Sequence, residues 1–134
     1  MTGRSALVAI CAALWLVCVP IEVRAATIVV LQGLDKTTAR VSTFEGAAGS
    51  VIHFGTLAIT VHDCRKHPPE EDPETAAFLD IDENLPGLAK PVHWFTGWMF
   101  ASSPAVSALE HPVYDVWVLD CRTDTGSIAK SSGK

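Results

Sequence analysis

Short segments rich in Val, Ile, Thr and aromatic residues recur along the chain, and clusters of Gly, Pro or Asp separate them about every eight to twelve residues. Several of these segments alternate between apolar and polar positions. In Leu57–Cys64, for example, Leu57, Ile59 and Val61 share one face, while Thr60 and His62 share the other. This pattern predicts an all-β fold, a small antiparallel β-sandwich or partly closed barrel of about seven strands with one short helix.

The seven predicted strands are Thr27–Gln32, Thr38–Phe44, Ser50–Phe54, Leu57–Cys64, Thr75–Asp82, His93–Phe100 and Tyr114–Cys121. Gly46–Gly49 is a predicted turn, and Gly55 joins two strands as a hairpin. The short helix is predicted at Ser103–Leu109, because Pro104 suits a first helical turn and Ser103 suits an N-cap. Glu83–Lys90 contains Pro86-Gly87 and is a predicted loop.

Residues 1–25 have a different pattern. Arg4 precedes a short apolar run at residues 6–19, and small residues follow up to Ala25, which is the composition of a secretory signal peptide. The apolar run is too short for a permanent membrane span and ends at Pro20. We therefore predict cleavage after Ala25, a single β domain at 26–121 and a disordered polar tail at 122–134.

The four cysteines support export. Cys11 and Cys18 belong to the leader, and Val17 occupies the position where lipoprotein signals carry a small residue, so no lipid anchor is expected. Cys64 and Cys121 remain, and an even pair in an exported domain of this size predicts a disulfide. On the chain-entropy model, a closed loop of this length stabilises the fold by roughly 4 kcal/mol. The alternative is a pair of unbonded buried thiols.

Charge excludes some partners. Removing Arg4, Arg24 and Glu22 with the leader leaves eight basic and fourteen acidic residues, a net charge of −6. Such a chain does not neutralise the phosphates of nucleic acid or of an anionic membrane surface. We therefore expect neither nucleic acid nor a membrane surface as a partner.

The strand His93–Phe100 is the most aromatic one. Strict alternation places Trp94, Thr96, Trp98 and Phe100 on one face and Phe95, Gly97 and Met99 on the other. One interpretation is a central strand that is covered on both faces, since a chain this small needs aromatic volume in its core. The other is an exposed aromatic strip that binds a partner, because Trp is enriched at binding hot spots.

Residues 65–74 contain three prolines, which remove backbone donors and favour polyproline geometry. The acidic residues of this segment indicate either a solvated loop or a ready-made docking edge for a basic partner. Together the two segments give a candidate binding surface, to which the last predicted strand adds one tryptophan. It consists of Trp94, Trp98, Phe100, Trp117, Glu70, Glu71 and Glu74.

Signals for catalysis are weak. His111 lies beside Glu110 and near Asp115, which suggests a hydrolase as an alternative function. However, Pro112 makes this segment a turn, and the chain has neither a Gly-x-Ser-x-Gly elbow nor a free cysteine nucleophile after the leader. We predict no catalytic residue.

Signals for a metal are also weak. The histidines are scattered, and no pair shows the His-x-His or His-Glu-x-x-His spacing of a metal site. They are His53, His62, His67, His93 and His111. Distant ligands converge in some β folds, so a periplasmic metal-binding protein remains an alternative. We predict no metal and no cofactor.

Four stretches resemble an uncharacterised family of short exported alphaproteobacterial proteins. They are Leu34-Asp35-Lys36, the Pro68–Glu74 loop, Gly97–Pro104 and Glu110–Trp117. The similarity runs from about Leu31 to Cys121. It implies a bacterial source and, with the leader, a periplasmic location, but it assigns no catalytic residue. The sequence thus favours a non-catalytic periplasmic β-domain that binds a protein or an envelope component.

Overall fold

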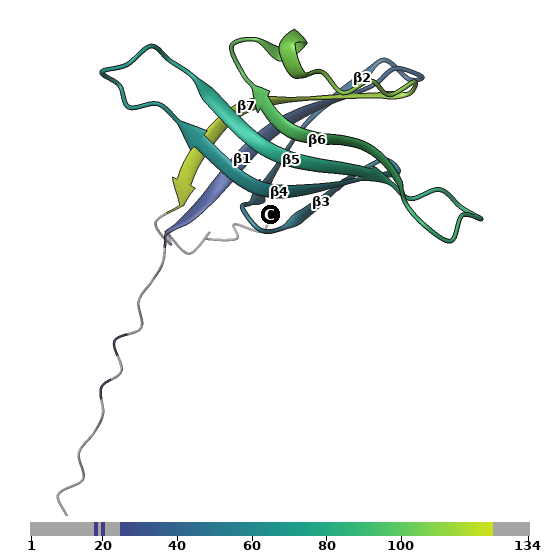
Figure 1. Cartoon of the computed structure of the whole chain (residues 1–134), viewed down its shortest axis with the longest axis horizontal. Helices are drawn as coiled ribbons and strands as arrows, with labels where there is room; N and C mark the ends of the chain where they lie inside the picture. The colour runs from purple at the N-terminus through teal and green to yellow at the C-terminus, as the bar shows by residue number, and fades with distance from the viewer. Residues whose placement is uncertain (1–17, 19, 21–24, 125–134) are drawn as a thin grey trace, which may run out of the picture.

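Two antiparallel sheets make up the fold in the computed structural model, which describes residues 18, 20 and 25–124 (Figure 1). The strands are β1 (Ala26–Asp35), β2 (Arg40–Ala47), β3 (Val51–Phe54), β4 (Leu57–Lys66), β5 (Thr75–Glu83), β6 (Val92–Phe100) and β7 (Tyr114–Asp124). The smaller sheet has the order β2-β1-β7, and the larger one has the order β3-β4-β5-β6. The predicted all-β fold of about seven strands is confirmed.

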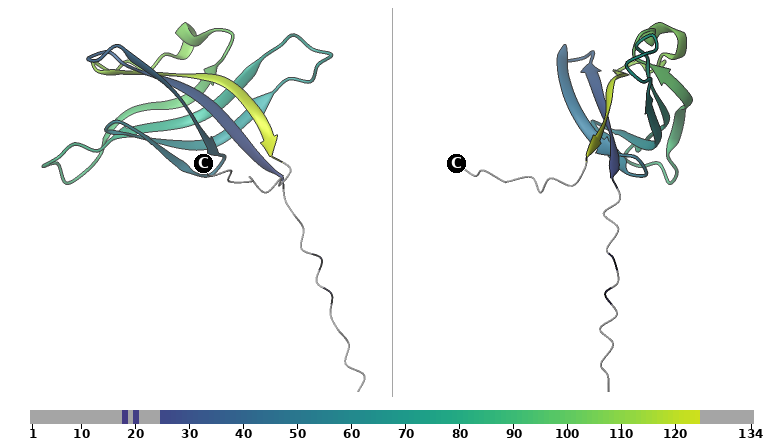
Figure 2. Two further views of the ribbon diagram at one scale, coloured as in Figure 1. Left: turned by 180° about the vertical axis from the view of Figure 1, so that it is seen from behind. Right: turned by 90° about the vertical axis from the view of Figure 1, so that its left-hand side faces the viewer.

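The core lies between the two sheets, which form two layers in Figure 2. Because side chains alternate along a strand, each sheet has an inner face toward this core and an outer face away from it. On the larger sheet, the aliphatic side chains of β4 and β5 fill the inner face completely. The residues with no exposed surface are Val29, Leu31, Leu57, Ile59, Val61, Ala77, Leu79 and Ile81.

Local turns set the registers of the hairpins. The side chain of Asp35 accepts hydrogen bonds from the backbone N–H groups of Thr37 (2.8 Å) and Thr38 (3.2 Å), and the β1–β2 turn includes Thr38 and Ala39, which were predicted as strand. Between β3 and β4, Gly55 has a φ of +57°, and a Cβ atom there would lie 2.4 Å from the Tyr114 hydroxyl. Only glycine fits this turn without strain.

The disulfide between Cys64 and Cys121 joins the layers, with a Cα–Cα distance of 5.8 Å. Cys64 lies near the end of β4 in the larger sheet, and Cys121 lies in β7 of the smaller sheet. The predicted pairing is therefore confirmed. The bond fixes the end of β4 next to the groove described below.

Further predicted boundaries differ from the structure. Residues Arg122–Asp124, assigned to the tail, continue β7 because Ala26–Ile28 of β1 pair with them. The predicted helix is a 3₁₀ turn, η1 (Pro104–Ser107), and the Ser103 side chain makes no capping hydrogen bond. The cleavage region before Ala25 and the rest of the tail, 125–134, lie outside the described residues. Within the described part, no helix has the length and hydrophobicity needed to cross a membrane.

Candidate functional site

An aromatic cluster, formed by Phe78, Trp98 and Phe100, lies on the outer face of the larger sheet. Phe78 of β5 is directly opposite Trp98 of β6, and their rings meet edge to face with centroids 5.5 Å apart. All three side chains are half-buried, although the sheet's inner face is already filled by other residues. This cluster is therefore not part of the core between the sheets.

A guanidinium group lies over this cluster. The Cζ atom of Arg65, on β4, is 5.4 Å from the centroid of the Trp98 ring. The Nε atom of Arg65 donates a hydrogen bond to Asp63 at 2.7 Å. Trp98 and Asp63 together hold a cation by a cation–π contact and a charge-assisted hydrogen bond.

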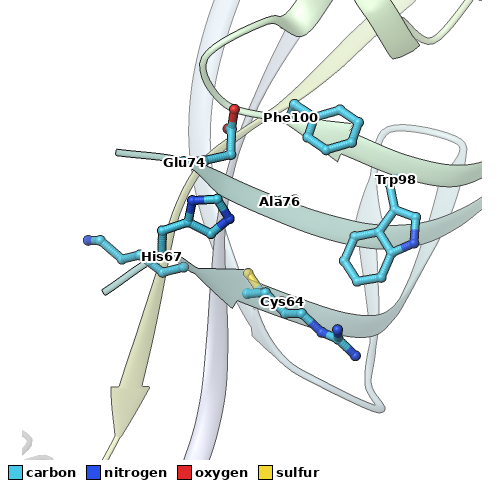
Figure 3. Close-up of a pocket in the computed structure, with 8 residues that line it drawn as sticks. Cys64, His67, Glu74, Ala76, Trp98 and Phe100 are labelled. Atoms are coloured by element: carbon cyan, nitrogen blue, oxygen red, sulfur yellow. The ribbon is translucent and has the colours of Figure 1, made fainter. Parts of the chain in front are cut away.

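A groove of about 740 Å³, hereafter the aromatic groove, runs across the ends of β4, β5 and β6 (Figure 3). It is lined by Cys64, Arg65, Lys66, His67, Glu74, Ala76, Trp98 and Phe100. Its origin is visible in the strand register, where Ala76 lies between Arg65 and Phe100. Because Ala76 is the small residue between two long ones, the outer face is hollow there.

The proline-rich loop extends this surface. A second hollow, of about 460 Å³, shares Lys66, His67 and Glu74 with the aromatic groove, and Glu71 lines it as well. The ring of His67 contacts the loop, with Nδ1 3.1 Å from the carbonyl oxygen of Asp72. The loop was predicted to be either a solvated segment or a docking edge; in the structure His67 and Glu74, at its two ends, line the same groove as Trp98 and Phe100.

Glu74 is held in a fixed position at the end of the aromatic groove. It accepts hydrogen bonds from the Ser102 hydroxyl, the Ser102 backbone N–H (3.4 Å) and the Thr75 backbone N–H (3.0 Å). The Ser102 hydroxyl bond, with these backbone donors, lowers the pKa of Glu74 below its ordinary value despite the opposing effect of burial. The groove therefore contains an ionised carboxylate at neutral pH.

A row of polar side chains continues along the same outer face. His62 contacts Asp80 (2.6 Å), the Thr96 hydroxyl donates to Asp80 (2.6 Å), and His93 lies between Thr96 (2.9 Å) and Asp82 (2.7 Å). The Thr96 and His62 hydrogen bonds lower the pKa of Asp80. These side chains meet only because of the register between β4, β5 and β6. The pattern of apolar positions in the sequence does not predict that register.

Trp94 does not share the face of Trp98, which corrects the predicted alternation. The β5–β6 register shifts between Ile81 and Asp82, whose partners are Phe95 and His93, so Trp94 is an extra residue in a β-bulge. Its side chain packs against the core. Its indole Nε1 donates a hydrogen bond to Glu83 at 3.0 Å.

His111 is also buried, with only 4% of its surface exposed. Its Nδ1 accepts hydrogen bonds from the backbone N–H groups of Val113 and Tyr114, both at 3.1 Å. Since Nδ1 accepts, the ring proton is on Nε2, which lies 3.1 Å from Glu83. His111 is therefore a neutral donor that links the segment before β7 to the larger sheet.

These contacts do not form the predicted hydrolase pairing. The carboxylate bound to His111 is Glu83, whereas Glu110 is exposed and Asp115 pairs with Lys36 at 3.1 Å. Both ring nitrogens of His111 already make hydrogen bonds inside the protein, so neither is free to exchange a proton with a substrate. The arrangement is structural.

A usable signal for Glu83 is present in the sequence, but the prediction missed it. Ala77, Leu79 and Ile81 alternate along one face, and Glu83 continues the same alternation, although it was assigned to a loop. Only a folded structure reveals the three donors that offset its burial, Thr56, Trp94 and His111.

The remaining candidate residues lie elsewhere. Trp117 is on the outer face of the smaller sheet and lines a small hollow beside Pro104 and Leu109. Glu70 lines neither the aromatic groove nor the second hollow. Among the residues that the structure describes, no three His, Cys, Asp or Glu side chains are arranged to hold a metal ion. The groove thus brings together Trp98, Phe100 and Glu74.

Comparison with known families places this geometry in context. The model of a bacterial family, described as "Uncharacterized protein conserved in bacteria (DUF2155)", matches residues 29–121. The chain belongs to this family. The match covers every strand described above except the ends of β1 and β7.

The chain is also similar to an uncharacterized protein of Rickettsia prowazekii (strain Madrid E), with 34% identity over 93 residues. This alignment covers 66% of the chain and 56% of the relative, so the chain spans little more than half of that protein's length. No solved structure matches the chain. The resemblance predicted from the four sequence stretches is confirmed.

Proposed function

We propose that this protein is an exported, non-catalytic β-domain of the periplasm that binds a segment of another protein in the aromatic groove. The observation that carries the proposal is the location of Trp98 and Phe100 on an outer face whose opposite face is already packed. Aromatic side chains that stay half-exposed outside the core are typical of interaction sites.

The construction of the groove supports binding rather than core packing. Ala76 leaves a hollow between Arg65 and Phe100, and the disulfide at Cys64 holds the end of β4 beneath it. A rigid, preformed site loses less conformational entropy when a partner binds. Export is supported by the leader pattern of residues 1–25 and by the disulfide, which persists in oxidising compartments.

Site-specific crosslinking in cells tests the proposal. A photo-reactive phenylalanine analogue replaces Phe100 in the groove or, as a control, Trp117 on the outer face of the other sheet. We expect a defined crosslinked product from position 100 that is absent from position 117. The substitution Ala76→Leu fills the groove without altering charge or the inner face, so it should remove that product.

Two results would contradict the proposal. One is the absence of a product from position 100 in cells that contain folded protein. The other is the same set of products from both positions, since this would indicate random collision rather than a site.

A further inference from the structure

The contact of Arg65 with Trp98 shows how side chains on this outer face hold a cation. The guanidinium lies over an aromatic ring, 5.4 Å from its centroid, while a carboxylate, Asp63, holds it at 2.7 Å. In this arrangement the ring quadrupole and the carboxylate act on the same cation. The chain's own arginine occupies this position.

In the part of the chain that the structure describes, a second ring and carboxylate in the same groove, Phe100 and Glu74, have no Lys or Arg between them, although His67 lies near Glu74. Phe100 and Glu74 both line the aromatic groove, and Figure 3 draws both side chains above Ala76. Within residues 25–124, no Lys or Arg is stacked on Phe100. The other groove cation, Lys66, is directed to Asp120, to which its Nζ donates a hydrogen bond at 2.7 Å.

Glu74 is prepared to hold a cation. Its three donors, from Ser102 and Thr75, fix the carboxylate without neutralising it, and an ionised carboxylate offers about four acceptor sites. Its lowered pKa keeps it charged. A bound ammonium or guanidinium therefore meets a preoriented acceptor rather than a mobile side chain.

The negative charge around the groove also favours a cationic ligand. The loop next to the groove is exposed and strongly acidic, and further carboxylates follow along the sheet. The acidic residues are Glu70, Glu71, Asp72 and Glu74 in the loop and Asp63, Asp80 and Asp82 on the outer face. The only Lys and Arg among them, Arg65 and Lys66, are both paired with aspartates.

We infer that the groove binds a basic segment of another exported protein, with a lysine or arginine of that segment placed between Phe100 and Glu74. This inference rests on the proposed function and adds the chemistry of the partner. The second hollow, lined by Glu71 and the loop prolines, is continuous with the groove and receives the neighbouring residues of the segment. A phosphate-bearing ligand is repelled by the same field.

An NMR titration of the mature protein, purified from the periplasm, tests the inference with three blocked ten-residue peptides. These peptides alternate alanine with arginine, with glutamate or with glutamine. We expect the arginine peptide alone to shift the amide signals of residues 65–76 and 98–102, and its affinity to fall as salt is added. Glu74→Gln should weaken it about tenfold, because a charge-assisted hydrogen bond is lost.

Glu110→Gln is the matched control, since it removes one exposed charge outside the groove and should leave the affinity unchanged. Equal binding of the glutamine and arginine peptides, or equal losses in the two variants, would overturn the inference. So would shifts at the same amides produced by peptidoglycan-derived oligosaccharides and by none of the peptides. In each case a crosslink from position 100 still supports the groove, whereas its absence removes both proposals.

Discussion

The buried network around Glu83 and His111 gives a graded stability prediction. The carboxylate of Glu83 accepts hydrogen bonds from Thr56 (2.7 Å) and Trp94 (3.0 Å) and contacts Nε2 of His111 (3.1 Å). Its side chain is 8% exposed and that of His111 is 1% exposed. Removing the His111 donor leaves the buried carboxylate with one hydrogen-bond partner fewer, which costs about 1.5–3 kcal/mol.

Three variants separate the contributions of this network to the free energy of unfolding. His111→Ala removes the donor to the charged Glu83 and also leaves the N–H groups of Val113 and Tyr114 without their acceptor, so the two costs together should be about 3–5 kcal/mol. His111→Asn retains an acceptor near the position of Nδ1 but does not reach Glu83. It should therefore cost about 1.5–3 kcal/mol, the value of a hydrogen bond to a charged group.

Glu83→Gln should be the mildest change. The amide oxygen is able to accept from Trp94 and His111, and the amide NH₂ group donates to the Thr56 hydroxyl, which reverses its role. No buried group loses its partner, and only the charge is removed. We expect a loss of about 1 kcal/mol.

Urea unfolding at neutral pH, followed by far-ultraviolet circular dichroism with the disulfide intact, measures these differences. The hydrogen bond from Thr56, with those from His111 and Trp94, lowers the pKa of Glu83 in spite of its desolvation. The stabilisation is therefore complete above the unfolded pKa of about 4.3 and is lost as the pH falls through the lower folded value. Glu83→Gln should flatten this acidic limb.

The reasoning would be refuted if Glu83→Gln destabilised the protein more than His111→Ala. It would also be refuted if His111→Ala cost less than about 1 kcal/mol, which is the average effect of a point substitution. A wild-type protein with unchanged stability between neutral and strongly acidic pH would contradict the assigned charge of Glu83.

Other predictions concern the aromatic residues, the disulfide and the leader. Trp98→Ala should cost only about 1 kcal/mol in urea unfolding, whereas Trp94→Ala should cost about 3–5 kcal/mol because Trp94 packs on the core; equal losses would contradict the assigned faces. Replacing Cys64 and Cys121 together by serine should remove about 4 kcal/mol, since their separation of 57 residues sets the loop entropy. Amino-terminal sequencing of protein released from the periplasm should begin at Ala26, and an intact leader would contradict export.

The alternation of apolar positions was sufficient to predict all seven strands, because one buried face per strand leaves a period of two in the sequence. It was not sufficient to predict which face Trp94 occupies. A single bulge residue opposite Ile81 and Asp82 reverses the alternation for everything before it on β6. Such a bulge is defined by the pairing of two strands, so the sequence of one strand is not enough to predict it.

The candidate site was predictable in its residues but not in its assembly. Trp98, Phe100 and Glu74 were selected for their chemistry, yet β5, with Ala76 at its outer face, separates β4 from β6 in the sheet. Ala76 carries no chemical signal, although its small size creates the groove. Contacts of this kind follow from sheet order, which the pattern of a single strand does not encode.

The core and the groove lie on opposite faces of the larger sheet, so substitutions can change one without the other. Inner-face residues such as Leu79 and Ile81 are fully buried, so substitutions there alter folding. Ala76 and Phe100 lie on the other face, where substitutions change the groove while the core stays filled. A loss of partner binding in Ala76→Leu with an unchanged unfolding midpoint therefore reports on the groove itself.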